Sequence, residues 1–301
     1  METIQACTLC PRACGANRTE QTGFCGGGRR VRLARAALHT WEEPCISGTR
    51  GSGAVFFSGC PLRCCFCQNH SISIDNFGAE ITTSRLADIF LELQEQGAHN
   101  INLVSATQYI PWVVRALDQV RHRLTIPVVY NTGGYEKPET IRTLTDYVDI
   151  YLPDCKYKDS SLSARYSAAP DYFAWASAAI IEMYRQTGPV KTGADGLLQK
   201  GVMIRHLVLP GCRKDSIAVL EWIAEQFPAG TVLLSLMSQY TPNRTAALYP
   251  ELNRRIFTAE YRTVLQSAED LGLSGYMQQR SSAKQEYTPD FHLQGVYQAA
   301  L

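Results

Sequence analysis

The sequence lacks the features that would place the protein in a membrane or on nucleic acid. No apolar run approaches the roughly 20 residues that cross a bilayer. Lys and Arg total 29 against 28 Asp and Glu, so there is no excess charge to attract nucleic acid or an anionic membrane surface. The opening METIQACTLC has no basic stretch followed by an apolar one, so we expect no export signal and a cytoplasmic location.

Cysteine, in contrast, is abundant, with 11 in 301 residues. Structural disulfides are rare in the cytoplasm, so clustered thiols there favour metal ligands or catalysts. Eight of the cysteines form two clusters, at residues 7–25 and 60–67. The other three stand alone, at Cys45, Cys155 and Cys212, and a lone cysteine is most often a small buried hydrophobe.

After the first cluster, strand and helix patterns alternate along the chain. Short apolar segments separated by amphipathic helices predict a parallel sheet covered by helices, because parallel strands need crossover connections. Strands are predicted within 54–58, 100–108, 126–134, 148–157, 202–211 and 231–240, and a last short strand within 274–279. The pattern predicts an α/β fold, a partial (β/α)6 TIM-like barrel.

The composition along the chain predicts two units. Residues 1–45 would form a small cysteine-rich metal-binding module, and residues 46–301 would form the barrel with a C-terminal extension. The glycine-containing stretch at residues 191–201 is expected to be a mobile loop.

The second cysteine cluster lies in GCPLRCCFCQNH, residues 59–70. Cys60, Cys64 and Cys67 have the spacing C-x3-C-x2-C, so three thiolates on one tight loop can converge on a single inorganic cluster. Cys65 is excluded as a ligand because side chains of adjacent residues diverge. Three ligands on a four-iron cube leave one iron open. Zinc, or a purely structural loop, is the alternative, although no second C-x2-C pair follows at the usual distance.

With Phe66 before its last cysteine, the loop resembles the signature of radical S-adenosylmethionine (SAM) enzymes, and it follows a predicted strand as in that family. The resemblance implies a [4Fe–4S] cluster whose open iron is chelated by the amino and carboxylate groups of SAM. It further implies that one electron cleaves the cofactor, and that the 5′-deoxyadenosyl radical so formed abstracts a hydrogen atom from a substrate.

Later strand ends resemble those of pyruvate formate-lyase activating enzymes, over about residues 50 to 245. LPDCK is similar to their Leu-Asp-x-Lys, and IRHLVLPG to their Ile-Arg-Tyr-x-x-x-Pro-Gly. Asp154 and Lys156 lie on one side of their strand and suit a zwitterionic amino acid. The resemblance implies that Arg205 pairs with the methionine carboxylate, to which a guanidinium can donate two parallel hydrogen bonds.

The remaining SAM-binding residues are also implied by the resemblance. At the second strand the family has a Gly-Gly-Glu-Pro-like motif for the methionine amino group, which is replaced here by VSATQ. The third strand ends in YNTGG, where the activating enzymes have an Asp-Thr-Asn-Gly-like stretch. The candidates are Phe66 in the cysteine loop, Ser105, Ala106 and Thr107 at the second strand, Asn131 and Thr132 at the third, and Gln239 and Tyr240 at the sixth.

The first cluster has the spacing C-x2-C-x3-C-x10-C and contains Cys7, Cys10, Cys14 and Cys25. Four thiols within nineteen residues can close one tetrahedral site, for which zinc and an iron–sulfur cluster are both suitable. A disulfide or a patch of free thiols is the alternative. The segment also resembles the opening of a subgroup similar to pyruvate formate-lyase activating enzymes, so we expect a metal-stabilised module packed on the barrel.

Three functional hypotheses remain open. The first is a radical SAM oxidoreductase that activates a partner by abstracting hydrogen from a glycine, with flavodoxin or ferredoxin as the one-electron reductant. The second is a radical SAM enzyme acting on a small metabolite or a peptide. The third is a non-catalytic iron–sulfur sensor or assembly protein, against which Asp154, Lys156 and Arg205 argue because a sensor needs no amino-acid pocket.

Overall fold

A mixed sheet organises the chain. The computed structural model describes residues 4–242, 248–278 and 289–297, and in these residues the sheet runs in the order β10-β9-β8-β6-β5-β4-β2-β1-β3, with β7 paired to β8. Its parallel strands follow one another in chain order. They are β2 (Ser52–Phe57), β4 (Ile101–Val104), β5 (Val128–Thr132), β6 (Ile150–Pro153), β8 (Leu198–Leu207), β9 (Leu233–Met237) and β10 (Gly275–Met277).

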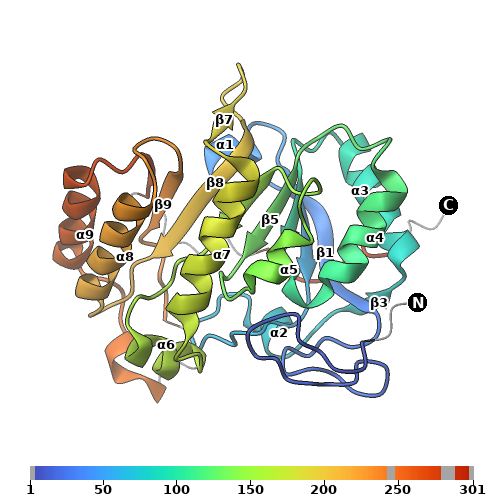
Figure 1. The fold of residues 1–301 in the computed structure, drawn as a ribbon, viewed down its shortest axis with the longest axis horizontal. Coiled ribbons are helices and arrows are strands. Elements are labelled where there is room, and N and C mark those ends of the chain that lie inside the picture. The colour runs from blue at the N-terminus through green and yellow to red at the C-terminus, as the bar shows by residue number, and fades with distance from the viewer. Residues whose placement is uncertain (1–3, 243–247, 279–288, 298–301) are drawn as a thin grey trace.

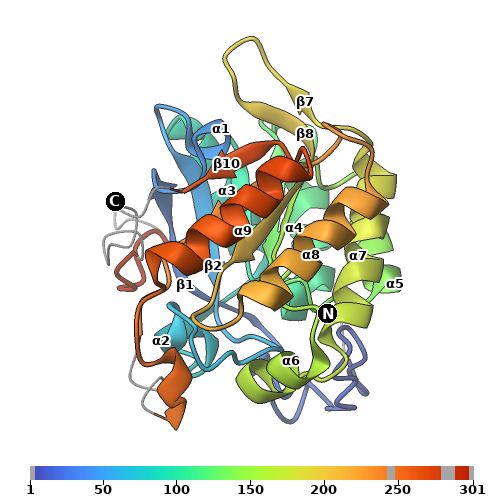
Figure 2. The ribbon, with the colours of Figure 1, turned by 90° about the vertical axis from the view of Figure 1, so that its left-hand side faces the viewer.

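Helices between these strands cover the outer face of the curved sheet (Figure 1, Figure 2). The main ones are α3 (Thr83–Glu95), α4 (Ile110–Val120), α5 (Pro138–Arg142), α7 (Tyr172–Thr187), α8 (Arg213–Gln226) and α9 (Thr258–Asp270). Shorter ones are α2 (His70–Ser73), η1 (Thr107–Tyr109), α6 (Ser160–Ser167) and η3 (Pro250–Leu252). Within the described residues, no helix combines the length and the apolar character that a membrane span requires.

Helix α4 shows why these segments fold as they do. Pro111 lies in its first turn, where the missing N–H would have no helical partner in any case. Buried side chains then recur three and four residues apart, at Val113, Ala116, Leu117 and Val120. This spacing puts them on one face of the helix, which packs onto the sheet.

The strands alternate between two apolar layers. In β5, Val128 and Tyr130 belong to the core beneath the outer helices, whereas Val129 belongs to a second cluster on the inner face. Ile46 of helix α1 (Pro44–Ser47) is buried in that second cluster. Figure 1 places α1 at the end of the sheet opposite to α2.

The sheet does not close. Strand β1 (Val31–His39) runs antiparallel between β2 and β3 (Ala79–Ile81), and in the described residues the sheet has two ends, at β3 and β10. The predicted partial α/β barrel is therefore confirmed. Strand β1 lies within residues 1–45 but pairs with the sheet, and the division of the chain into two units stays a prediction.

Residues 289–297 cover the edge of the sheet at β1. Leu293 donates its N–H to the Ala34 carbonyl at 3.0 Å, and Ala36 donates to the Gln294 carbonyl at 2.8 Å. Gly295 has a φ of 70°, and a Cβ there would lie 1.9 Å from the Ala36 carbonyl oxygen. Only glycine therefore allows this close backbone approach.

Residues 191–201, expected to form a mobile loop, instead form a β-hairpin. Strand β7 (Lys191–Thr192) pairs antiparallel with the first residues of β8. Gly193 donates its N–H to the Leu197 carbonyl at 2.8 Å, which closes the turn. Gly193 and Gly196 thus lie in the turn of a hairpin and not in a mobile loop.

Candidate functional site

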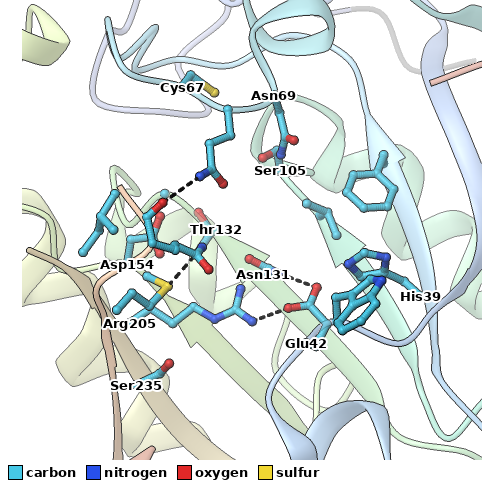
Figure 3. Close-up of a pocket in the computed structure, with 18 of the residues that line it drawn as sticks. His39, Glu42, Cys67, Asn69, Ser105, Asn131, Thr132, Asp154, Arg205 and Ser235 are labelled. Atoms are coloured by element: carbon cyan, nitrogen blue, oxygen red, sulfur yellow. Dashed lines mark hydrogen bonds and ion pairs between the residues drawn. The ribbon is translucent and has the colours of Figure 1, made fainter. Parts of the chain in front are cut away.

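A cleft of about 700 Å³ opens where the parallel strands end. It is lined by residues that directly follow the strands, among them Ser105 after β4, Gly133 after β5 and Asp154 after β6. In barrels of this kind the carboxyl ends of the strands meet at one rim, where side chains can converge on a ligand. Figure 3 shows polar side chains from several strands facing this cleft.

The loop after β2 brings three cysteines to the cleft. The described lining residues include Cys60, Cys64 and Cys67 but not Cys65. The Cys65 thiol instead lies within electrostatic range of Glu251. This arrangement agrees with the expectation that adjacent side chains diverge, and Cys60, Cys64 and Cys67 remain the predicted cluster ligands.

Each of these three sulfurs accepts a hydrogen bond. The Ser167 hydroxyl donates to Cys64 Sγ at 3.0 Å, and the Ser73 hydroxyl donates to Cys67 Sγ at 3.2 Å. Cys60 Sγ accepts the backbone N–H two residues further on at 3.5 Å. Such donors stabilise negative charge on sulfur and tune the potential of a bound cluster.

The three thiols of the loop would ionise only beside a positive centre. Burial raises the pKa of Cys60 to about 11 and that of Cys64 to about 12, and the neighbouring thiols add to both shifts. The free thiols are therefore neutral at pH 7, whereas a bound metal deprotonates its thiol ligands. Three soft sulfurs at the mouth of a polar cleft fit an iron–sulfur cluster with one open iron.

Asp154 and Lys156 lie beside the cysteine loop and form an ion pair. Burial alone would lower the pKa of Lys156, but Asp154 and the Cys64 sulfur raise it above its usual range. The Tyr172 hydroxyl accepts a hydrogen bond from the backbone N–H of Lys156 at 3.0 Å and donates one to the backbone carbonyl of Asp154 at 2.8 Å. The pair thus offers one anion and one cation, rigidly held, next to the predicted cluster ligands.

Arg205 has two partners that the sequence analysis missed. Its guanidinium forms ion pairs with both Glu42 and Glu43, which precede α1. All three side chains are about one-tenth exposed, at 11%, 10% and 9%. Figure 3 shows Glu42 between Arg205 and Asn131, whose amide nitrogen lies 3.4 Å from the carboxylate.

These ion pairs bear on the role predicted for Arg205. Burial opposes ionisation of Glu43, but the neighbouring Arg205 prevails and holds the pKa of that carboxyl below its usual value. The guanidinium is therefore already neutralised by carboxylates of the protein. Its pairing with the methionine carboxylate stays a prediction, and Lys156, which is closer to the cysteine loop, is an alternative cation for that role.

The three candidates at the end of β4 are in different environments. Ser105 borders the cleft and has a φ of 61°, the left-handed region that non-glycine residues rarely adopt. Ala106 and Thr107 are buried, and the described cleft lining does not include them. The next residue, Gln108, donates its amide N–H groups to the carbonyls of Ser58, Gly59 and Ser105 at 2.9–3.0 Å. It thereby fastens the start of the cysteine loop to β4.

Asn131 and Thr132 both border the cleft at the end of β5. Behind them lies Glu136, which is fully buried. One carboxylate oxygen of Glu136 accepts hydrogen bonds from the hydroxyls of Thr107, Tyr130 and Thr132, and the other has no hydrogen-bond partner among the described residues. Burial outweighs these hydrogen bonds and raises the pKa of Glu136 to about 7.

The last three candidates are Phe66, Gln239 and Tyr240. Phe66 and Gln239 border the cleft. Tyr240 is buried: its ring packs edge-on against Phe66 with centroids 6.3 Å apart, and its hydroxyl donates to the Leu252 carbonyl at 2.7 Å. Tyr240 is therefore placed to position Phe66, while Gln239 can contact a ligand directly.

The four N-terminal cysteines also gather in one place. Cys7, Cys10, Cys14 and Cys25 line a small cavity of about 10 Å³. In the described part of the chain, no three Cys, His, Asp or Glu side chains are already arranged around a single metal position.

The functional groups that sequence reasoning missed differ in how they could have been found. Glu136 follows a strand end within YNTGGYEK, so it belongs to the same class of position as the residues that were identified. Glu42 and Glu43 precede the barrel strands, and only the fold of the chain between β1 and α1 brings them to Arg205.

Comparisons with known proteins agree with this geometry. Residues 54–157 match the model of the Radical SAM superfamily. An uncharacterized protein of Methanocaldococcus jannaschii is 28% identical over 282 residues, which are 89% of this chain and 75% of the relative. Residues 54–157, which include Cys60, Cys64 and Cys67, are therefore similar to that superfamily.

Two solved structures match parts of this chain. Methylornithine synthase has a TM-score of 0.50 at 13% identity, covering 81% of this chain and 72% of its own. Streptococcus suis SuiB, bound to S-adenosylmethionine, has a TM-score of 0.49 at 14% identity, covering 73% of this chain and 48% of its own. At 13% identity, the likeness to methylornithine synthase bears on the fold alone.

Replacing Glu136 by Gln is expected to change how stability depends on pH. The folded state raises the carboxyl pKa from 4.5 to about 7. The protonated carboxyl therefore contributes fully to the stability of the fold below pH 4.5, and this contribution is lost as the pH rises through 7. The full shift corresponds to about 3 kcal/mol. Urea unfolding from pH 5 to 8 should show a decline in the wild type that Glu136→Gln lacks. Parallel pH profiles would contradict this assignment.

Removing Arg205 is expected to destabilise the protein strongly. Arg205→Ala leaves Glu42 and Glu43 buried without a counter-ion, at a cost of about 3–5 kcal/mol in the free energy of unfolding. Neutralising both carboxylates as well, in the triple variant with Glu42→Gln and Glu43→Gln, should recover much of the loss. Urea unfolding measures both effects, and a loss below about 1 kcal/mol in the single variant would refute the buried pairing.

Proposed function

We propose that this protein is a radical SAM enzyme whose [4Fe–4S] cluster is held by Cys60, Cys64 and Cys67. The observation that carries the proposal is that these three cysteines border one cleft at the carboxyl ends of a parallel sheet, within the residues that match the superfamily. The open iron would face a cleft whose polar groups suit an amino acid cofactor.

The cluster and SAM, when bound, would supply one-electron chemistry that abstracts a hydrogen atom from a substrate. The residues of the chain bind and orient. Lys156 offers a cation to a carboxylate, and Asp154 accepts hydrogen bonds from an ammonium group. Ser105, Asn131 and Gln239 offer hydrogen-bonding groups along the same cleft, where a ribose and an adenine would need them.

For the substrate, we propose a glycine of a partner protein, as in the pyruvate formate-lyase activating enzymes that the motifs resemble. The open sheet, with ends at β3 and β10, supports this proposal because a peptide needs access to the interior. A small metabolite or short peptide is the second candidate, favoured by the cleft volume of about 700 Å³, which lies in the range of small-molecule sites.

The proposal also includes partners and a second site. A one-electron reductant such as flavodoxin or ferredoxin would supply electrons to the cluster. We expect the cytoplasm as the compartment because it keeps thiols reduced. The N-terminal cysteines are proposed to hold a second metal ion or cluster. A non-catalytic sensor is disfavoured because the Asp154–Lys156 pair is built into the cleft.

The cysteine assignment predicts unequal effects of neighbouring substitutions. Cys64→Ala should abolish formation of 5′-deoxyadenosine from SAM with dithionite, because the cube loses one of its three ligands. Cys65→Ala is the matched control and should retain most of the activity, since its thiol does not border the cleft.

Iron and sulfide analysis should be carried out on the same samples and on Cys60→Ser, which should lose the cluster. Equal inactivation of the Cys64 and Cys65 variants would show that the ligand set is wrong. A wild type that binds no iron after anaerobic reconstitution would refute the proposed function.

A further inference from the structure

The N-terminal four-cysteine segment contacts the loop that carries Cys60, Cys64 and Cys67. Figure 1 shows it as loops, in dark blue, beside the region of α2. We propose that Cys7, Cys10, Cys14 and Cys25 bind one zinc ion, and that this ion holds the second cysteine loop in the geometry that its iron–sulfur cluster requires. The second half of this inference rests on the proposed function, whereas the zinc site stands without it.

The four cysteines border one cavity. All four line the same cavity, and three of them are buried. A Cβ built on Gly23 would lie 3.4 Å from Cys14 Sγ and 3.6 Å from Cys25 Sγ, so both sulfurs point toward the same glycine. Cys7 and Cys14 are also in hydrogen-bond contact through their side chains.

Backbone amides in this segment are already directed at sulfur. The Gly27 N–H donates to Cys25 Sγ at 3.4 Å, and Cys14 accepts from the backbone of Phe24 and Ala16. These donors would also serve sulfurs bound to a metal ion, because hydrogen bonds to sulfur stabilise negative charge on it. Residues 4–30 contain no helix or strand in the structure, so a metal clip would supply the stability that secondary structure does not.

The size of the cavity favours a single ion over a second cube. A volume of about 10 Å³ is close to the space of one water-sized probe. Zinc in structural sites is enclosed by four ligands at about 2.3 Å from sulfur, with no position open to solvent. Because no three sulfurs are yet closed around one point in the described residues, zinc binding must draw them inward.

Backbone contact connects this site to the second loop. The Cys60 N–H donates to the Cys25 carbonyl at 3.1 Å. Gly59 has a φ of 86°, and a Cβ there would lie 2.2 Å from the same carbonyl oxygen. The two cysteine loops therefore pack backbone to backbone with no side chain between them, so a displacement of Cys25 moves Cys60.

Arg12, between Cys10 and Cys14, makes the second connection. Its guanidinium donates to the Pro61 carbonyl at 2.8 Å and to the Ser167 carbonyl at 3.0 Å. The Ser167 hydroxyl in turn donates to Cys64 Sγ. Arg12 thus joins the second cysteine loop to the end of α6. A zinc ion bound by Cys10 and Cys14 would fix the backbone on both sides of Arg12.

The test is metal analysis of anaerobically purified and reconstituted full-length protein. The wild type should contain one zinc and about four irons per chain. Cys60→Ser should lose the iron and keep the zinc. Cys14→Ser, at the exposed member of the set, should lose the zinc and lower iron retention and 5′-deoxyadenosine formation at least about tenfold. Cys212→Ser is the control for loss of a thiol and should keep both metals.

Two results would overturn the inference. A wild type with about eight irons and no zinc would show a second cluster in place of the ion. A zinc-free Cys14→Ser protein with full iron content and activity would show that the site does not support the second loop. Absence of iron in the wild type, with zinc still present, would instead refute the proposed function and leave the zinc site standing.

Arg12 variants separate support of the loop from loss of the zinc ion. Arg12→Gln should keep the zinc but shorten the half-life of the iron–sulfur absorbance in air several-fold, and Arg12→Lys should restore it in part, because an ammonium cannot span two carbonyls as a guanidinium does. Circular dichroism confirms that the variants fold. A half-life equal to that of the wild type in Arg12→Gln would contradict the connection through Arg12.

Discussion

The parallel alignment of consecutive strands is the constraint on which the site depends. Because β2, β4, β5, β6, β8 and β9 are neighbours in chain order, segments separated by more than 150 residues end at one rim. The cysteine loop follows the first of these strands, and polar residues lie at the ends of β4, β5, β6 and β9. The same alignment requires helical crossovers, which cover the outer face and leave the inner face for ligands.

The charged side chains of Arg205, Lys156 and their acidic neighbours in the cleft are paired. Arg205 is matched by two glutamates from the segment before α1, and Lys156 by Asp154. Burying an ion costs free energy unless the ion is paired, so these groups hold one another in place and form a rigid polar lining of the cleft. Glu136 is different, because its carboxylate has only neutral donors and one oxygen without a partner. It accepts a hydrogen bond from Thr132, a residue that borders the cleft.

The N-terminal segment belongs physically to the site although it precedes the barrel strands. Cys25 contacts Cys60 through the backbone, and Arg12 reaches the carbonyls of Pro61 and Ser167. At the other end of the chain, residues 289–297 lie along β1. The two segments outside the repeated strand–helix units thus have different roles. The N-terminal segment supports the cysteine loop, and residues 289–297 cover an edge of the sheet.

The sequence by itself determined the α/β class, the order of the parallel strands and the residues at their ends, because hydrophobic periodicity and turn residues are local signals. The spacing of Cys60, Cys64 and Cys67 indicated a shared ligand for the same reason. Only the tertiary structure decided that Glu42 and Glu43 neutralise Arg205, that Thr107 and Tyr240 are buried rather than exposed to the cleft, and that Gly59 packs on Cys25. These contacts join residues far apart in the chain, and no periodic pattern encodes such distances.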